Sequence, residues 1–135
     1  MREDEAYLEI AERFIDSCDR HISHAVNIQE VIGFKAYHAF ESLGGAFNSH
    51  YGHKVPLTHS SKINSFVTNS RKNALLNGQK VAIVAMLVMS MRNKYLYPEI
   101  VGGTFKNPKD QLSMTDAKQT VSKVKGILRQ VKKII

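Results

Sequence analysis

The longest apolar run in this chain, VAIVAMLVMSM at residues 81–91, sets the tightest limit on how the chain can fold. A helix that crosses a membrane needs about 20 consecutive apolar residues, whereas this run has 11 and lies between Lys80 and Arg92. The run lacks the alternation of apolar and polar residues that marks a half-buried strand. We therefore expect a buried helix and no membrane anchor.

The other segments of the chain also place apolar residues at helical spacing. The second helix is expected to begin near a capping residue at Asn27 and to end at Gly52, and the third to open near Thr58. The last is expected over about Thr115 to Ile135. The first has one apolar stripe opposite an acidic face, and the stripe consists of Leu8, Ala11, Ile15, Cys18 and Ile22.

Glycine and proline mark the breaks between these helices. Asn77-Gly78 indicates a turn or a helix C-cap before the apolar run, and Pro98 should end that helix at Tyr97. The segment VGGTFKNPKD, residues 101–110, is expected to be a loop. The Gly44-Gly45 pair inside the second helix indicates either a bend or the close approach of another backbone. The sequence thus predicts an all-α fold, an antiparallel bundle of four or five helices.

Composition indicates one compact soluble domain over residues 1–135. Of these residues 43% are hydrophobic, 23% are charged and only three are Pro. The single cysteine, Cys18, cannot form an internal disulfide, and the acidic N-terminal segment does not look like a signal peptide. We expect a protein of the reducing cytoplasm.

Charge is distributed unevenly along the chain. Residues 1–20 hold seven acids and three bases, whereas residues 54–135 hold three acids and fifteen bases, giving −4 and +12 within a net charge of +7. A basic half of this kind favours an anionic partner such as nucleic acid or a nucleotide, although many basic surfaces only keep a protein in solution.

Motifs for metal, nucleophile or phosphate-loop chemistry are missing. The histidine pairs His21/His24 and His50/His53 have no third and fourth ligand near them in sequence. No nucleophile-elbow sequence occurs, and the glycine pairs lack the strand and Lys that a P-loop requires. We therefore expect neither a metal nor another cofactor.

Polar side chains directly follow the apolar run, in the segment RNKYLYP at residues 92–98. On a helix, Arg92 lies beside Tyr95 and Asn93 beside Tyr97, and a guanidinium can bind a phosphate through two parallel hydrogen bonds. The alternative is structural: Arg92 would extend from the core to solvent and the tyrosine rings would pack with their hydroxyls in water.

Three stretches together resemble the HEPN domain family, named for higher eukaryotes and prokaryotes nucleotide-binding. They lie on the second, third and fourth expected helices, and a long basic helix follows where that family has its closing helix. The likeness covers about residues 5–135, and its stretches read AYHAFESLGGAF, PLTHSSKINSF and MRNKYLYP.

The resemblance implies a HEPN-like helical bundle that forms a homodimer, with the polar motifs of both copies facing a shared cleft. Many such proteins are metal-independent endoribonucleases, often toxins with a partner antitoxin protein. The family signature is an Arg, commonly followed by a polar residue, and then a His four to six positions later. Arg92 and Asn93 fit its first half, but Tyr97 stands where the His most often falls. His59 and His38, in the matching stretches, are the candidates to replace that histidine.

Three functions follow as hypotheses. The leading one is a HEPN-like domain that binds RNA or a nucleotide, with weak or atypical metal-independent cleavage, and its expected catalytic residues are Arg92, Asn93 and Tyr97. The expected binding residues are Arg92, Lys94, Tyr95, His59 and Lys125. The second hypothesis is an active endoribonuclease toxin, and the third is a non-enzymatic helical adaptor whose basic face docks an acidic protein.

Overall fold

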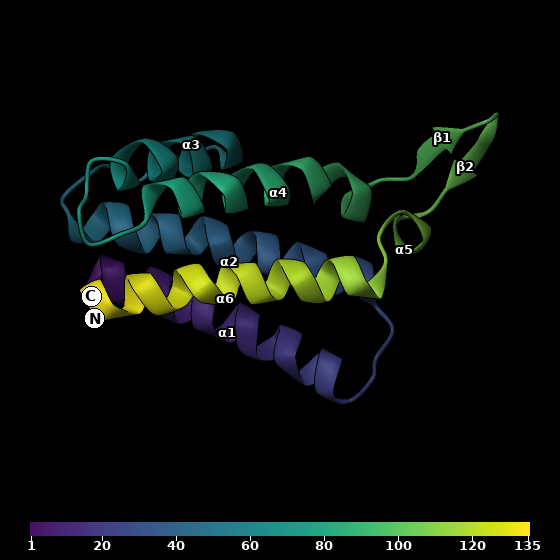
Figure 1. The fold of residues 1–135 in the computed structure, drawn as a ribbon, viewed down its shortest axis with the longest axis horizontal. Helices are drawn as coiled ribbons and strands as arrows, with labels where there is room; N and C mark the ends of the chain where they lie inside the picture. Colours follow the sequence, from purple (N-terminus) through teal and green to yellow (C-terminus); the bar gives the residue numbers. More distant parts are fainter.

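Helix α2 (Gln29–His50) forms the centre of a helical bundle in the computed structural model, which describes all 135 residues. It packs against each of the other four long helices (Figure 1). These are α1 (Glu3–Ser23), α3 (His59–Ser70), α4 (Gly78–Leu96) and α6 (Met114–Ile134). The all-α bundle predicted from sequence is confirmed.

The core is built from the apolar stripes that the helical periodicity predicts. On α1 the buried residues Ala11, Ile15 and Cys18 belong to the predicted stripe. Three aromatic rings fill the space between α2 and α3, where Phe66 lies 5.3 Å from Phe40 and 5.5 Å from Phe47 between ring centroids. Burying a side chain of this size contributes roughly 1.5–3 kcal/mol, so these rings fix how α3 lies on α2.

Helix α3 runs beside α2 in the same direction, so the bundle is not antiparallel throughout. Near its start His59 contacts Glu41, and near its end Asn69 donates a hydrogen bond to Asn48, so the contacts advance along both helices together. Thr58 caps α3 as predicted, accepting a hydrogen bond from the Ser61 amide. The chain must therefore turn back after α2 before α3 begins, which places His59 beside the middle of α2.

Two predicted helix ends differ from the structure. The N-cap of α2 is Ile28, without a side-chain hydrogen bond, rather than Asn27. Asn77 is the N-cap of α4, where its side chain accepts from the Lys80 amide, and not part of a C-cap. Pro98 has the expected effect: α4 ends at Leu96 and Tyr97 is extended.

The segment after Pro98, expected to be a loop, contains a β-hairpin. Strands β1 (Glu99–Val101) and β2 (Thr104–Lys106) pair in antiparallel register and project from the bundle (Figure 1). The two-residue turn has positive φ at both Gly102 and Gly103, the conformation that the tightest hairpin turns require. A short helix α5 (Pro108–Gln111) follows. Helix α6 then runs back along α1, with Lys132 near its end paired to Glu12, so both ends of the chain lie at the same end of the bundle (Figure 1).

Helix α4 is buried on one side only, which corrects the expectation of a wholly buried helix. Val81, Val84 and Val88 are in the core, but Ile83 is 53% and Met86 73% exposed. The bundle therefore has an apolar surface on α4 that nothing in the monomer covers. None of the helices combines the length and the hydrophobicity that crossing a membrane requires.

Candidate functional site

The end of α4, the start of α3 and the middle of α2 meet around a small cavity of about 180 Å³, which we call the Arg92 cleft. The predicted residues Arg92, Asn93 and His59 all line it. The remaining lining residues, which the sequence did not single out, are Tyr37, Ser60 and Met89. Residues from three helices thus meet at one site.

Arg92 is half-buried, and its guanidinium carbon lies 5.8 Å from the centre of the Tyr37 ring. A guanidinium over an aromatic face is held in position by a cation–π attraction of about 0.5–2 kcal/mol. Arg92 takes part in none of the ion pairs of the structure. Its hydrogen-bond donors therefore remain available for an anion that enters the cleft.

His59 is oriented by a buried carboxylate. Its Nδ1 lies 2.8 Å from Oε2 of Glu41, which is only 6% exposed. The other oxygen of Glu41 lies 3.3 Å from Nζ of Lys62. Because an ionised carboxylate only accepts hydrogen bonds, Nδ1 must carry the proton. The second nitrogen, Nε2, makes no hydrogen bond within the structure.

His38 lies behind His59, with its ring at 6.0 Å from the His59 ring in an edge-to-face arrangement. Its ring also stacks on Phe14 and meets Phe34 edge-on. Burial among these groups lowers the pKa of His38, so its imidazole is neutral near pH 7. His38 does not line the Arg92 cleft, and it packs against the histidine that does.

The two tyrosines beside Arg92 have structural roles. Tyr37 is 2% exposed, and burial raises its pKa to about 12, so its hydroxyl stays protonated at neutral pH. Tyr95 is also buried, and its hydroxyl donates to the Val88 carbonyl over 3.2 Å. Tyr95, expected among the binding residues, thus has its side chain in the core and does not line the Arg92 cleft.

Tyr97 and Lys94 line a neighbouring cavity of about 490 Å³ and not the Arg92 cleft. Tyr97 is 57% exposed and lies on extended backbone just beyond the end of α4. Asn93 lines both cavities and joins them. A ligand longer than one phosphate could therefore extend from Arg92 toward Tyr97.

Lys125, expected among the binding residues, is elsewhere in the structure. It lines a hollow between α1 and α6, where its Nζ lies 2.8 Å from the Asp19 carboxylate. Lys132 on the same helix pairs with Glu12 of α1. Acidic residues of α1 thus neutralise part of the basic charge of α6, and Lys125 does not belong to the Arg92 site.

Glu41, which holds His59, is a further residue of the site that the sequence did not single out. It is the only acid in the second half of α2, where apolar residues surround it in sequence, and an acid at a core position needs a buried partner. The stretch AYHAFES contains that signal, but it does not identify the partner.

No group of three or more His, Cys, Asp or Glu side chains is arranged to hold a metal ion. Comparison with protein-family models, curated proteins and solved structures found no match to this chain.

Proposed function

We propose that this protein binds RNA at the Arg92 cleft and cleaves it without a metal, with His59 transferring the proton. One observation carries the proposal. His59, which is held by the buried Glu41, lines the same cavity as Arg92, which has no ion-pair partner. A phosphate-binding guanidinium and an oriented imidazole are the groups that phosphodiester transfer needs.

Binding would rest on the scissile phosphate. Arg92 can hold two of its oxygens, and the exposed side chains of Asn93 and Ser60 can donate to the others. The adjoining cavity, lined by Lys94 and Tyr97, would take the next nucleotide, since an exposed aromatic ring can stack on a base. Residues 54–135, which include Arg92, carry a large excess of positive charge, and this favours the approach of a polyanion.

Cleavage would follow the intramolecular path open to RNA. The 2′-oxygen attacks phosphorus as His59 Nε2 takes the 2′-hydroxyl proton, and the 5′-oxygen of the next nucleotide, on the opposite side of phosphorus, leaves with a proton taken from water. Arg92 would stabilise the negative charge that grows on the phosphoryl oxygens. The products are a 2′,3′-cyclic phosphate and a 5′-hydroxyl.

Replacing Arg92 with Ala is expected to weaken RNA affinity about ten- to one hundred-fold, because a charge-assisted hydrogen bond contributes about 1.5–3 kcal/mol. The measurement is fluorescence anisotropy with a labelled single-stranded RNA in buffer containing EDTA. Lys133→Ala, at an exposed lysine near the end of α6, is the matched loss of one positive charge and should leave affinity within about twofold. Tyr97→Phe tests whether the tyrosine hydroxyl takes part.

Equal weakening by Arg92→Ala and Lys133→Ala would mean that RNA binds through diffuse charge, and the proposal would fail. The adaptor hypothesis predicts the reverse result: neutralising Lys123, Lys125, Lys132 and Lys133 abolishes partner binding while Arg92→Ala leaves it intact. The toxin hypothesis adds a cellular readout, since expression of the wild-type chain would arrest growth and Arg92→Ala would relieve the arrest.

We further propose that two copies of the chain associate through the exposed side of α4. Ile83, Met86 and Met89 lie at helical spacing on that side and are 53%, 73% and 39% exposed. Met89 also lines the Arg92 cleft, so a second copy packed there would form part of the cleft wall. A twofold axis beside α4 would place the same surface of each copy in contact.

Met86→Glu is expected to convert this dimer into a monomer, because it would bury a carboxylate without a partner at the centre of the interface. Size-exclusion chromatography with light scattering at micromolar concentration measures the change. Leu57→Glu is the control, at an apolar residue that is 92% exposed and lies outside α4. A wild-type protein that is already monomeric, or a dimer that survives Met86→Glu, would refute the α4 interface.

A further inference from the structure

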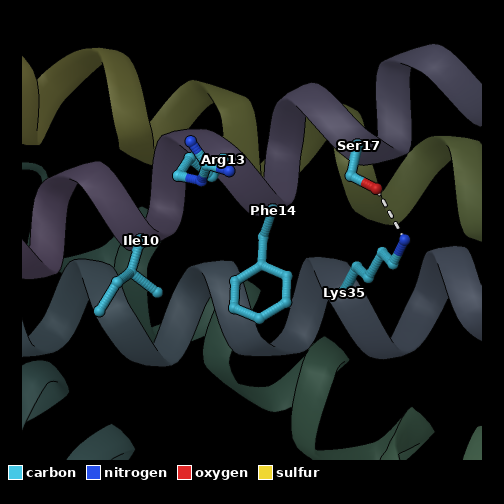
Figure 2. A pocket seen from close by; sticks show the side chains of 5 residues that line it. All are labelled: Ile10, Arg13, Phe14, Ser17 and Lys35. Carbon is cyan, nitrogen blue, oxygen red and sulfur yellow. Dashed lines mark hydrogen bonds between the residues drawn. The ribbon is translucent and has the colours of Figure 1, made fainter.

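A second groove, of about 370 Å³, lies between α1 and α2 and shares no lining residue with the Arg92 cleft. Figure 2 shows its walls: four side chains come from α1, and Lys35 reaches across from α2. Its volume falls within the range of small-molecule sites, about 300–1,000 Å³. The lining residues are Ile10, Arg13, Phe14, Ser17 and Lys35.

The α1 residues of this groove form one helical row beside the core-facing stripe. Arg13, Phe14 and Ser17 follow Ile10 by three, four and seven residues, so the four side chains lie along a single face of the helix. Ile10 is 42% exposed, and Phe14 is partly buried against the core. Ile10 and Phe14 give the groove an apolar floor that opens to solvent.

Both cations of the groove lack an anionic partner. Neither Arg13 nor Lys35 takes part in any ion pair of the structure. The Nζ of Lys35 donates to Ser17 Oγ over 2.6 Å and lies 3.0 Å from His21 Nε2 (Figure 2 draws the contact with Ser17). Because an ammonium has three donors and no acceptor, His21 must accept at Nε2, and one Lys35 donor remains unused.

We propose that this groove binds an amphipathic carboxylate, a small molecule with one carboxylate and an aliphatic body. The carboxylate would accept a hydrogen bond from the unused donor of Lys35. The exposed side chain of Arg13, one turn of α1 before Ser17, would turn toward it and bind it through two parallel hydrogen bonds. The aliphatic body would cover the solvent-exposed apolar surface of Ile10 and Phe14. Charge complementarity selects an anion over a neutral or cationic ligand of the same shape.

This site is independent of the proposed RNA chemistry, because none of its residues belongs to the Arg92 cleft. The two sites nevertheless share a neighbour. Phe14 stacks on His38, and His38 meets His59 edge-on. Failure of the carboxylate test would leave the RNA proposal unaffected, and failure of the RNA proposal would leave this groove as it is.

The test is a titration of the ¹⁵N-labelled full chain with decanoate below its micelle concentration, followed in amide NMR spectra. Saturable shifts confined to the amides around Ile10, Phe14, Ser17 and Lys35 are expected. Decanol, which has the same chain without the charge, should bind at least about tenfold more weakly. Arg13→Gln/Lys35→Gln should weaken decanoate at least tenfold and leave decanol unchanged, which separates loss of charge from loss of folding.

Lys54→Gln/Lys72→Gln removes two exposed lysines far from the groove in sequence and serves as the matched charge control. It should leave decanoate affinity unchanged. The proposal is overturned if decanoate causes no saturable shifts at the groove, or if decanol binds as well as decanoate. Equal weakening by the groove double variant and the control double variant would also overturn it, because the carboxylate would then respond only to overall charge.

Discussion

His59→Asn is expected to lower the rate of RNA cleavage about 10²- to 10⁴-fold, the contribution of a positioned acid or base, while RNA affinity changes little. The asparagine removes the nitrogen that would exchange the proton, but it can still donate a hydrogen bond to Glu41. The measurement is single-turnover cleavage of a labelled RNA with EDTA present, analysed for a 2′,3′-cyclic phosphate end. Because Arg92 is untouched, binding and cleavage should separate in this variant.

Two further variants make the result specific to His59. His53→Asn is the matched control at an exposed histidine just before α3, and it should cleave like the wild type. Glu41→Gln should reduce cleavage less than His59→Asn, since it weakens the orientation of the imidazole without removing it. Cleavage that persists in His59→Asn would remove His59 from the mechanism and return attention to Tyr97. Cleavage absent from the wild type would leave the site a binding site only.

The helices could be predicted from sequence because their signals are local. The apolar stripe of α1 and the cap at Thr58 both involve residues within a few positions of each other, as does the stop at Pro98. The hairpin was missed although Gly102-Gly103 between apolar residues is itself a turn signal. Its strands are short and exposed on both faces, so they lack the alternation by which strands are recognised.

The site was predicted only in part because its geometry depends on contacts between helices. Helical spacing placed Arg92 beside Tyr95 and Asn93 beside Tyr97, but it could not tell that the side chain of Tyr95 is buried in the core. The contact between His59 and Glu41 joins residues 18 positions apart on different helices. No pattern of neighbouring residues predicts that contact, because it depends on α3 running parallel to α2. The packing of α3 on α2 is therefore the feature on which the site depends.

That packing rests on a glycine, and Gly44→Ala is expected to lower the free energy of unfolding by about 1–2 kcal/mol. Helix α2 continues through Gly44, and Phe66 of α3 lies directly against this glycine. A Cβ at residue 44 would lie 2.9 Å from the Cβ of Phe66, which is fixed to the backbone of α3. Overpacking of this kind costs about 1–3 kcal/mol, more than the gain of up to about 1 kcal/mol that Ala brings to a helix.

Gly126→Ala is the matched control, in the interior of α6. There the new Cβ would meet only the flexible end of Lys80, with Nζ at 3.1 Å, so that side chain can move aside. This variant should keep the gain in helix propensity and raise the free energy of unfolding by up to about 1 kcal/mol, measured like Gly44→Ala by urea denaturation. Equal stability of the two variants would show that α3 is not seated on Gly44. If α3 does shift in Gly44→Ala, His59 moves with it, so RNA cleavage should fall in that variant and be unchanged in Gly126→Ala.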